Sequence, residues 1–238
     1  GLDGWAQGVV WALALALDMA EPFFFGSEGW SLEHPGHFAE RHGLIIIIAL
    51  GESIVAIGIG AGVAVDAGVV AAATLGIAGA AALWWLYFDV VALVAERSLA
   101  ELPAGRERNE RGRDSYSYLH FPMVAGIVLL ALGLKKTVAD VEHELGTVVA
   151  FAMLGGAAIY LLAHVAFRLR NIGTLNRQRL VCAVALVALI PFLARIPALV
   201  ALAILTGTLC GLVALEAVRF AEARARVRQS LAKESATH

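Results

Sequence analysis

The sequence predicts an all-α fold, a polytopic bundle of about seven transmembrane helices. Of the 238 residues, 60% are hydrophobic and only 16% are charged, whereas soluble domains average about 25% charged residues. The charged residues gather in a few short stretches. The apolar runs between them are mostly long enough to cross a bilayer, which takes about 20 residues.

Each apolar run is expected to form one helix. The first run is short, and little more than Pro197 separates the last two, so these two could instead form one hairpin with a very tight turn. We expect residues 1–218 to form a single transmembrane domain. The predicted helices cover residues 5–20, 43–62, 68–94, 117–137, 146–167, 179–195 and 197–218.

The segments between the helices are expected to be polar. Residues 33–43, "EHPGHFAERHG", are predicted to be a loop before the second helix, and residues 97–114 a charged loop that is partly helical. Residues 219–238 contain four arginines and one lysine, and predict a basic cytoplasmic tail held near anionic lipid.

The basic residues predict the orientation. If the N-terminus is outside, seven crossings place 15 of the 18 lysines and arginines on the inner side. The outer side then receives Lys135, Lys136 and Arg195. Cytoplasmic loops carry such an excess of basic residues. We therefore predict that the N-terminus is outside and the C-terminus inside.

A single charge, Glu52, lies near the centre of the second apolar run. A charge at mid-membrane costs at least about 2.5–3.5 kcal/mol, and intramembrane ionisable residues are usually functional. The simpler alternative is a protonated, structural Glu52, hydrogen-bonded to a neighbouring helix with help from Ser53. The helix is apolar on all sides, so the sequence does not say which way Glu52 points.

Other polar residues are predicted to lie in the inner half of the membrane. They include Asp89 near the end of the third helix, and Tyr118 and His120 at the start of the fourth. Pro122 is expected to bend that helix and free a carbonyl near His120. This distribution predicts a polar cavity open to the cytoplasm that narrows toward Glu52.

Three stretches together resemble one family. They are "HFAERHGLIIIIALGESIV", "WWLYFD" and "DSYSYLHFPMVAGIVLLALGLK", which lie between residue 37 and about residue 135. The chain is similar to the bacterial low temperature requirement A (LtrA) membrane proteins. Members are usually longer, with extra N-terminal segments, so we expect this chain to correspond to the C-terminal part.

The resemblance implies a multi-pass protein of the bacterial inner membrane but no settled biochemistry, since the family name refers to a growth requirement in the cold. Carried onto this sequence, the motif residues are His37, Glu40, Arg41, Gly51, Glu52, Ser53, Tyr118, His120 and Pro122.

The leading functional hypothesis is a transporter that uses Glu52 as a proton or cation site, with Ser53, Asp89, Tyr118 and His120 nearby. His120 could relay a proton because histidine titrates near physiological pH. A non-transporting sensor or assembly protein linked to cold adaptation is the main alternative.

A lipid-modifying membrane enzyme is a weaker alternative, because the chain contains neither an HxxxH nor an HExxH pattern. We therefore favour a protein that is not an enzyme and expect no cofactor and no metal site. The expected partners are the lipid bilayer and an unidentified small solute or ion. No basic, aromatic-interleaved patch suggests nucleic acid, and a homo-oligomer remains open.

Overall fold

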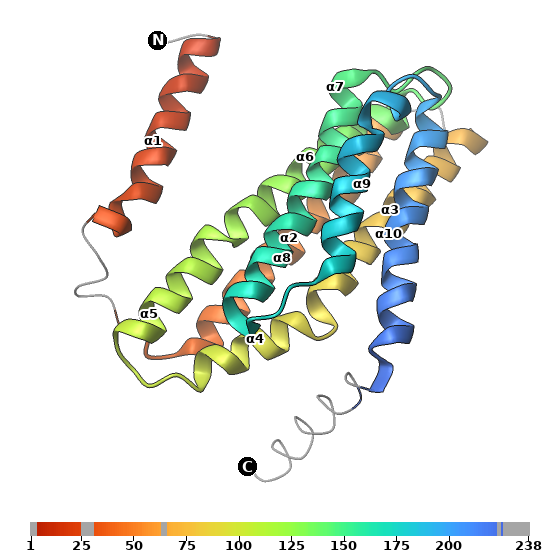
Figure 1. The fold of residues 1–238 in the computed structure, drawn as a ribbon. Coiled ribbons are helices and arrows are strands. Elements are labelled where there is room, and N and C mark those ends of the chain that lie inside the picture. The colour runs from red at the N-terminus through yellow and green to blue at the C-terminus, as the bar shows by residue number, and fades with distance from the viewer. Residues whose placement is uncertain (1–3, 25–30, 63–65, 223–224, 226–238) are drawn as a thin grey trace.

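The computed structural model describes residues 4–24, 31–62, 66–222 and 225, and confirms the all-α prediction (Figure 1). Most of the predicted tail, 223–224 and 226–238, lies outside these described residues. The elements are α1 (Trp5–Phe24), α2 (Pro35–Ala61), α3 (Ala67–Phe88), α4 (Val91–Ala100), α5 (Arg106–Gly112), η1 (Arg113–Tyr118, a π-helix), α6 (His120–Ala139), α7 (Thr147–Ala150), η2 (Phe151–Gly155, a π-helix), α8 (Gly156–Ile172), α9 (Arg177–Leu193) and α10 (Ala198–Arg219).

Each of the seven predicted apolar segments overlaps helical structure, but 68–94 spans α3 and the start of α4, and 146–167 spans α7, η2 and part of α8. Among the described residues, five continuous helical stretches are long and apolar enough to cross a membrane: Pro35–Ala61, Ala67–Ala100, Arg106–Ala139, Thr147–Ile172 and Ala198–Arg219. The remaining two segments form shorter helices, α1, with the apolar stretch Trp5–Ala20, and α9.

The loop predicted before the second helix is wrong. α2 begins at Pro35, so residues 35–42 form its first two turns. Proline is favoured at the first helical position, where its missing N–H needs no partner. The charged segment 97–114 is largely helical, and ion pairs between residues four apart, Arg97–Glu101 and Arg106–Glu110, support its turns.

The interior of the bundle depends on close contact between α6 and α8. A Cβ atom built on Gly126 would lie 2.6 Å from the carbonyl oxygen of Gly156, and a Cβ on Gly156 equally close to that of Gly126. A Cβ on Gly133 would likewise lie 2.7 Å from Cβ of Met153. Small residues let helix backbones touch in lipid, where dispersion contacts replace the hydrophobic effect.

Two tight turns meet at one end of the bundle. The N–H of Leu145, just before α7, donates to the carbonyl of Ile196 at 3.0 Å, and the N–H of Gly146 donates to that of Ala194 at 2.9 Å. Only residues 194–197 separate α9 from α10, so the tight turn anticipated for this pair is present.

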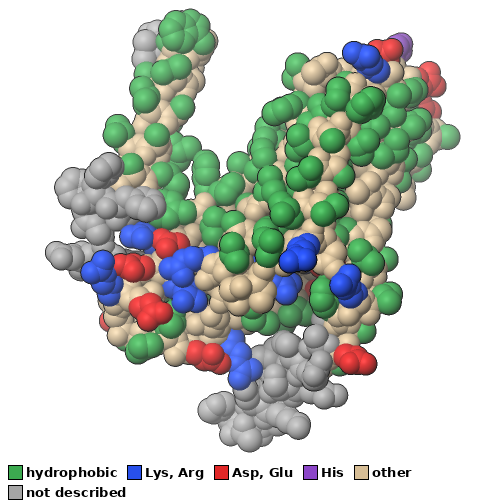
Figure 2. All heavy atoms as spheres, viewed as in Figure 1, with side chains coloured by type: hydrophobic (Ala, Val, Ile, Leu, Met, Phe, Trp, Pro, Cys, Tyr) green, Lys and Arg blue, Asp and Glu red, His purple; other side chains and the backbone are tan. Residues whose placement is uncertain are grey.

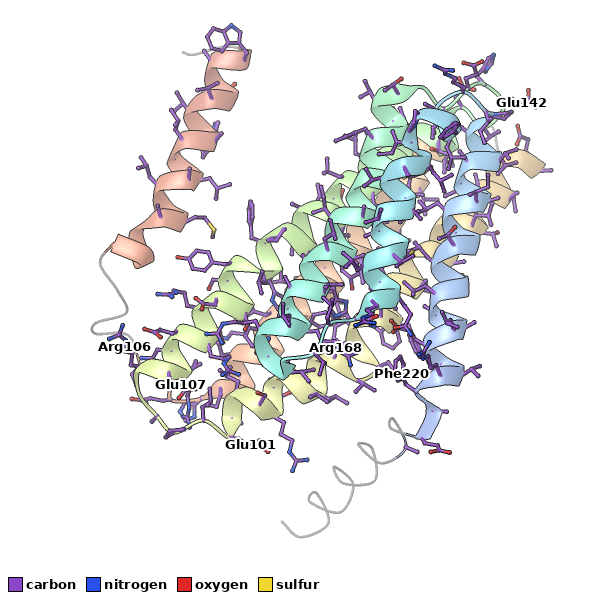
Figure 3. The ribbon with its side chains drawn as sticks, viewed as in Figure 1. Glu101, Arg106, Glu107, Glu142, Arg168 and Phe220 are labelled. Atoms are coloured by element: carbon purple, nitrogen blue, oxygen red, sulfur yellow. The ribbon has the colours of Figure 1, made fainter. Side chains whose placement is uncertain are left out.

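Charged side chains gather at the opposite end, around α4 and α5 (Figure 2). Figure 3 shows Glu142 at one end of the bundle and Glu101, Arg106 and Glu107 at the other. The strongly polar part of the molecule is therefore the end where α2 begins.

α1 stands apart from the other helices and approaches the bundle at its C-terminal end (Figure 1). There the hydroxyl of Tyr118 donates to the carbonyl of Met19 at 2.8 Å. Trp5, Trp11 and Leu17 are 82%, 71% and 72% exposed, as expected for side chains that face lipid.

Candidate functional site

His120 lies inside the bundle and makes two hydrogen bonds. Its Nδ1 atom lies 2.9 Å from the carbonyl oxygen of Ser115, and its Nε2 atom lies 2.8 Å from the hydroxyl of Tyr87 on α3. A carbonyl only accepts, so Nδ1 carries a proton in this arrangement. In the neutral ring, Nε2 then accepts from Tyr87. Protonating Nε2 would reverse the direction of that bond.

Aromatic rings enclose His120 on several sides. The Tyr116 ring stacks on it at 5.1 Å between centroids, and the rings of His42, Tyr87 and Phe167 pack edge-on at 5.4, 5.6 and 5.1 Å. His120 is 3% exposed. The imidazole is therefore held in one orientation by four rings contributed by α2, α3, η1 and α8.

The local backbone explains how His120 reaches this position. Residues 113–118 form the π-helix η1, and the N–H of Leu119 donates to the carbonyl of Asp114, five residues earlier. Such π-helical turns occur frequently at functional sites. Pro122 is the third residue of α6 and lacks an N–H. The carbonyl that pairs with His120 is that of Ser115, seven residues before Pro122, so the missing N–H of Pro122 does not account for it.

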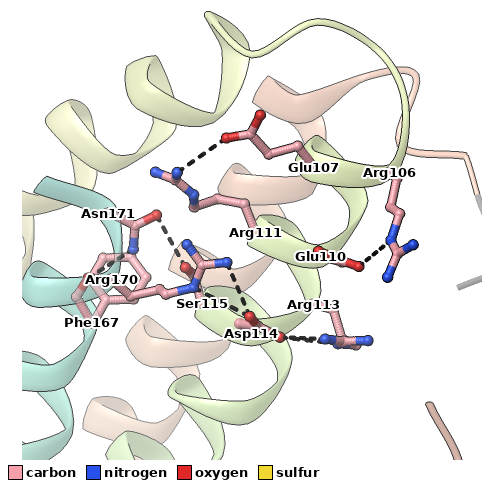
Figure 4. A network of polar contacts seen from close by, with 10 residues as sticks. All are labelled: Arg106, Glu107, Glu110, Arg111, Arg113, Asp114, Ser115, Phe167, Arg170 and Asn171. Atoms are coloured by element: carbon pink, nitrogen blue, oxygen red, sulfur yellow. Dashed lines mark hydrogen bonds and ion pairs between the residues drawn. The ribbon is translucent and has the colours of Figure 1, made fainter. Parts of the chain in front are cut away.

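A polar network fastens η1 to α8 (Figure 4). Asp114 accepts from Arg113 at 2.8 Å and from Arg170 of α8 at 3.1 Å, while the hydroxyl of Ser115 donates to Asn171 at 3.1 Å. These contacts immobilise the turn that presents Tyr116 and His120 to the interior.

Beside this cluster lies an acidic cavity of about 340 Å³ between α2, α3, α4 and η1. Its wall includes the carboxylates of Glu40 and Glu96, together with Tyr87 and Tyr116. Tyr116 is 2% exposed, and its buried hydroxyl oxygen has no hydrogen-bond partner among the described residues. Buried polar groups are normally paired, so this hydroxyl is available to a water, an ion or a solute.

A second polar cluster is buried where α8, α9 and α10 meet. Arg179 donates to both carboxylate oxygens of Glu216, at 2.8 and 2.7 Å, and to Nδ1 of His164 at 2.6 Å. The side-chain amide of Asn176 also donates to Glu216, at 2.8 Å. Because each group has partners, this cluster can hold three helices together without leaving a buried charge unpaired.

Asp89 belongs with this second cluster and not with His120. It caps the C-terminal end of α3 and lines a cavity of about 210 Å³. Arg168, Arg179 and Glu216 line the same cavity. Asp89 therefore shares a cavity with the half-buried Arg168 and the buried Arg179, an association that the sequence had not predicted.

Glu52 lies on the exposed side of α2. Its neighbours on that face, Ile48, Val55 and Ile59, are 71%, 54% and 58% exposed. His120 packs against His42, which lies ten residues before Glu52 on α2. At 1.5 Å rise per residue, that places His120 about 15 Å along the helix from Glu52. The structure therefore does not bring these two predicted site residues together.

The other predicted residues divide between the interior and the surface. Ser53 is fully buried, and its Oγ has no partner in the described part of the chain, whereas Tyr118 turns toward α1. His37 and Arg41 are exposed, and Nδ1 of His37 lies 3.4 Å from the Glu40 carboxylate. A Cβ built on Gly51 would meet nothing within 4 Å.

Sequence reasoning named His120 and Glu40 but missed several of their neighbours. Tyr87, Glu96 and Tyr116 were not proposed as site residues, and neither were Arg179 and Glu216. The spacing of Tyr116 one turn before His120 was a usable signal. No local pattern links Glu96 to Glu40, because they lie on different helices. No group of three or more His, Cys, Asp or Glu side chains within the described ranges could hold a metal ion.

Comparison with known proteins gives the family. The sequence profile of the bacterial low temperature requirement A protein (LtrA) matches residues 1–214, well beyond the stretch that carries the recognisable motifs. The chain is 28% identical over 163 residues to the uncharacterized protein RA0937 of Rhizobium meliloti (strain 1021). That match covers 64% of this chain and 39% of the relative, so the chain spans about two-fifths of the relative's length. No solved structure matches. The match over residues 1–214 establishes that the chain belongs to the bacterial low temperature requirement A family.

Proposed function

We propose that this protein is a transporter of the bacterial inner membrane, coupled to protons or to a small cation. The observation that carries the proposal is the acidic cavity of about 340 Å³, which is lined by Glu40, Glu96 and Tyr116, a tyrosine whose hydroxyl has no partner among the described residues. Two carboxylates and a hydroxyl are oxygen ligands, which hard cations prefer. A carboxylate beside a protein cavity can equally take up and release a proton.

The cavity lies at the arginine-rich end of the bundle, which we assign to the cytoplasm. Arg97, Arg106 and Arg177 belong to this end, whereas Lys135, near the end of α6, and Arg195, in the turn after α9, belong to the other. This assignment follows the positive-inside rule and keeps the predicted orientation, N-terminus outside and C-terminus inside. The proposed site is then loaded from the cytoplasmic side.

His120 and Tyr87 form the next step of the proposed path. Tyr87 lines the cavity and contacts His120 at 2.8 Å. A proton that reaches Nε2 reverses this hydrogen bond. The same two atoms stay paired in both arrangements, but the donor in one is the acceptor in the other. Such a pair can pass a proton from the cavity to His120 in the packed interior.

We propose Glu52, further along α2, as a second protonation site. A carboxylate in the middle of a spanning helix is costly in lipid. Ser53, beside it in sequence, has an unpaired buried hydroxyl among the described residues. We propose that protonation at Glu52 follows protonation at the cavity and does not share a site with it, since the two lie on different faces of α2.

Proton flux into vesicles tests the proposal. The full-length protein would be reconstituted in liposomes that contain a pH-sensitive dye, and an imposed pH gradient would be followed by dye fluorescence. Glu96→Gln, Glu40→Gln and Glu52→Gln remove one charge each and keep the side-chain shape. Glu142→Gln is the matched control, because Glu142 is exposed in the turn at the opposite end of the bundle.

We expect Glu96→Gln to reduce proton flux to that of protein-free vesicles, while Glu142→Gln leaves it unchanged. If only Glu52→Gln abolishes flux, the acidic cavity is not the site. If the wild type moves neither protons nor sodium ions, transport by these ions is excluded and the sensor or assembly alternative replaces it.

A further inference from the structure

A groove of about 620 Å³ runs between α9 and α10 on the outside of the bundle. Most of its wall is apolar and includes Val181, Leu212 and Leu215. Thr208 also lines the groove, but its hydroxyl donates to the carbonyl of Ile204 at 2.7 Å, within the same helix. The groove therefore presents a surface that suits a hydrocarbon chain.

The groove has the depth of one lipid leaflet. Its wall on α10 extends from Thr208 to Arg219. Eleven residues at 1.5 Å each correspond to about 16 Å, close to half of the roughly 30 Å hydrocarbon core. A groove of this length accommodates one acyl chain and not a whole transmembrane helix.

One end of the groove is basic. Arg177 is the first residue of α9 and Arg219 the last of α10, so both lie at the same end, with Gln178 beside them. Both arginine side chains are exposed, and in the described part of the chain neither has an ion-pair partner. Phe220, labelled in Figure 3, also lines the groove near this end. Unlike the buried Arg179, these two guanidinium groups donate to no other described residue, so their donors can bind a ligand.

We propose that this groove is a binding site for an anionic phospholipid. One acyl chain lies along Val181, Leu212 and Leu215, and the phosphate lies against Arg177 and Arg219. Guanidinium groups bind phosphate through paired N–H donors, and basic pockets between transmembrane helices bind anionic headgroups. The two basic side chains match the anionic headgroup of such a lipid. The adjoining apolar groove, one leaflet deep, matches its acyl chain.

The floor of the groove offers a direct way to test occupancy. A Cβ built on Gly211, which lines the groove, would meet nothing within 4 Å, so a larger side chain there fills the groove without disturbing the helix packing. Gly207 is equally open but is not part of the groove wall. Gly211→Leu and Gly207→Leu therefore form a matched pair.

The experiment compares two lipids with identical acyl chains, phosphatidylglycerol and phosphatidylcholine. The full-length protein in detergent would be titrated with each lipid, and bound lipid would be counted by native mass spectrometry. Arg177→Gln/Arg219→Gln tests the headgroup contact. Arg195→Gln serves as its control, because Arg195 is exposed on the same helix pair at the opposite end. Helix content and elution volume confirm that each variant is folded.

We expect the wild type to prefer phosphatidylglycerol. Each arginine near an anionic headgroup contributes roughly fivefold in affinity, so the double variant should lose roughly 30-fold for this lipid. Gly211→Leu should weaken both lipids, and Arg195→Gln and Gly207→Leu neither. Equal binding of the two lipids by the wild type would overturn the proposal, as would an unchanged affinity in Gly211→Leu. Binding of glycerophosphoglycerol as tightly as the intact lipid would show that the groove plays no part.

Discussion

Arg179 and Glu216 form a bidentate ion pair inside the bundle and join the start of α9 to the end of α10. Their side chains are only 4% and 7% exposed. Removing one partner of a buried pair leaves an uncompensated charge, which costs about 3–5 kcal/mol. We therefore expect Glu216→Gln to lower the free energy of unfolding by this amount, measured by thermal melting in detergent.

Two further variants separate the charge from the packing. The double variant Arg179→Met/Glu216→Leu removes both charges and should melt closer to the wild type than the single variant does. Glu101→Gln breaks an exposed pair with Arg97 and should cost less than about 1 kcal/mol. A Glu216→Gln protein that melts with the wild type would contradict the structural role of the pair.

The contact between α6 and α8 should not tolerate even one methyl group. We expect Gly126→Ala or Gly156→Ala to destabilise the protein by about 1–3 kcal/mol, because each new Cβ would collide with a backbone carbonyl. Gly58→Ala is the control, since its Cβ meets nothing within 4 Å and alanine favours helix. Equal melting temperatures for Gly126→Ala and Gly58→Ala would mean that the two helices do not pack this closely.

The Tyr87 hydroxyl should matter for proton movement and not merely for stability. Tyr87→Phe removes the partner of His120 Nε2, while Tyr160→Phe removes a hydrogen bond to the carbonyl of Leu83. Each should destabilise the fold by about 1 kcal/mol. Only Tyr87→Phe should slow proton flux in liposomes, by roughly tenfold for each 1.4 kcal/mol added to the barrier. Equal flux in both variants would remove Tyr87 from the proposed path.

Outside the spanning helices, His143 should titrate with a raised pKa. Its Nδ1 lies 2.7 Å from the Asp140 carboxylate, and this hydrogen bond raises the pKa of His143 and lowers that of Asp140. In Asp140→Asn, the histidine midpoint measured by NMR should fall. An unchanged midpoint would show that the two side chains do not pair in solution.

The same pair predicts a small pH dependence of stability. The contribution of His143 is fully present below the ordinary histidine pKa of 6.5 and is lost as pH rises through its raised value. The contribution of Asp140 is present above 3.8 and is lost as pH falls through its lowered value. The pair therefore stabilises most between these limits, and only weakly, because both groups are exposed.

Several features could be predicted from the sequence because they depend on local composition. Apolar runs of about 20 residues determine where helices cross a bilayer, and all seven predicted runs overlap helical elements. The motif residues His120 and Glu40 were found because each stands beside a recognisable pattern. The predicted start of α2 was too late. Residues 35–42 are polar but helical, and a prediction based on apolar runs could not include them.

The tertiary structure decided which of the polar residues meet. α2 carries apolar residues on every side, so nothing in its periodicity could place Glu52 on the exposed face or Ser53 in the interior. Glu96 joins Glu40, and Arg179 joins Glu216 and His164, only because separate helices pack together. The sequence by itself determined a helical membrane protein of one family. Helix rotation and packing decided its sites, because those depend on contacts between residues far apart in the chain.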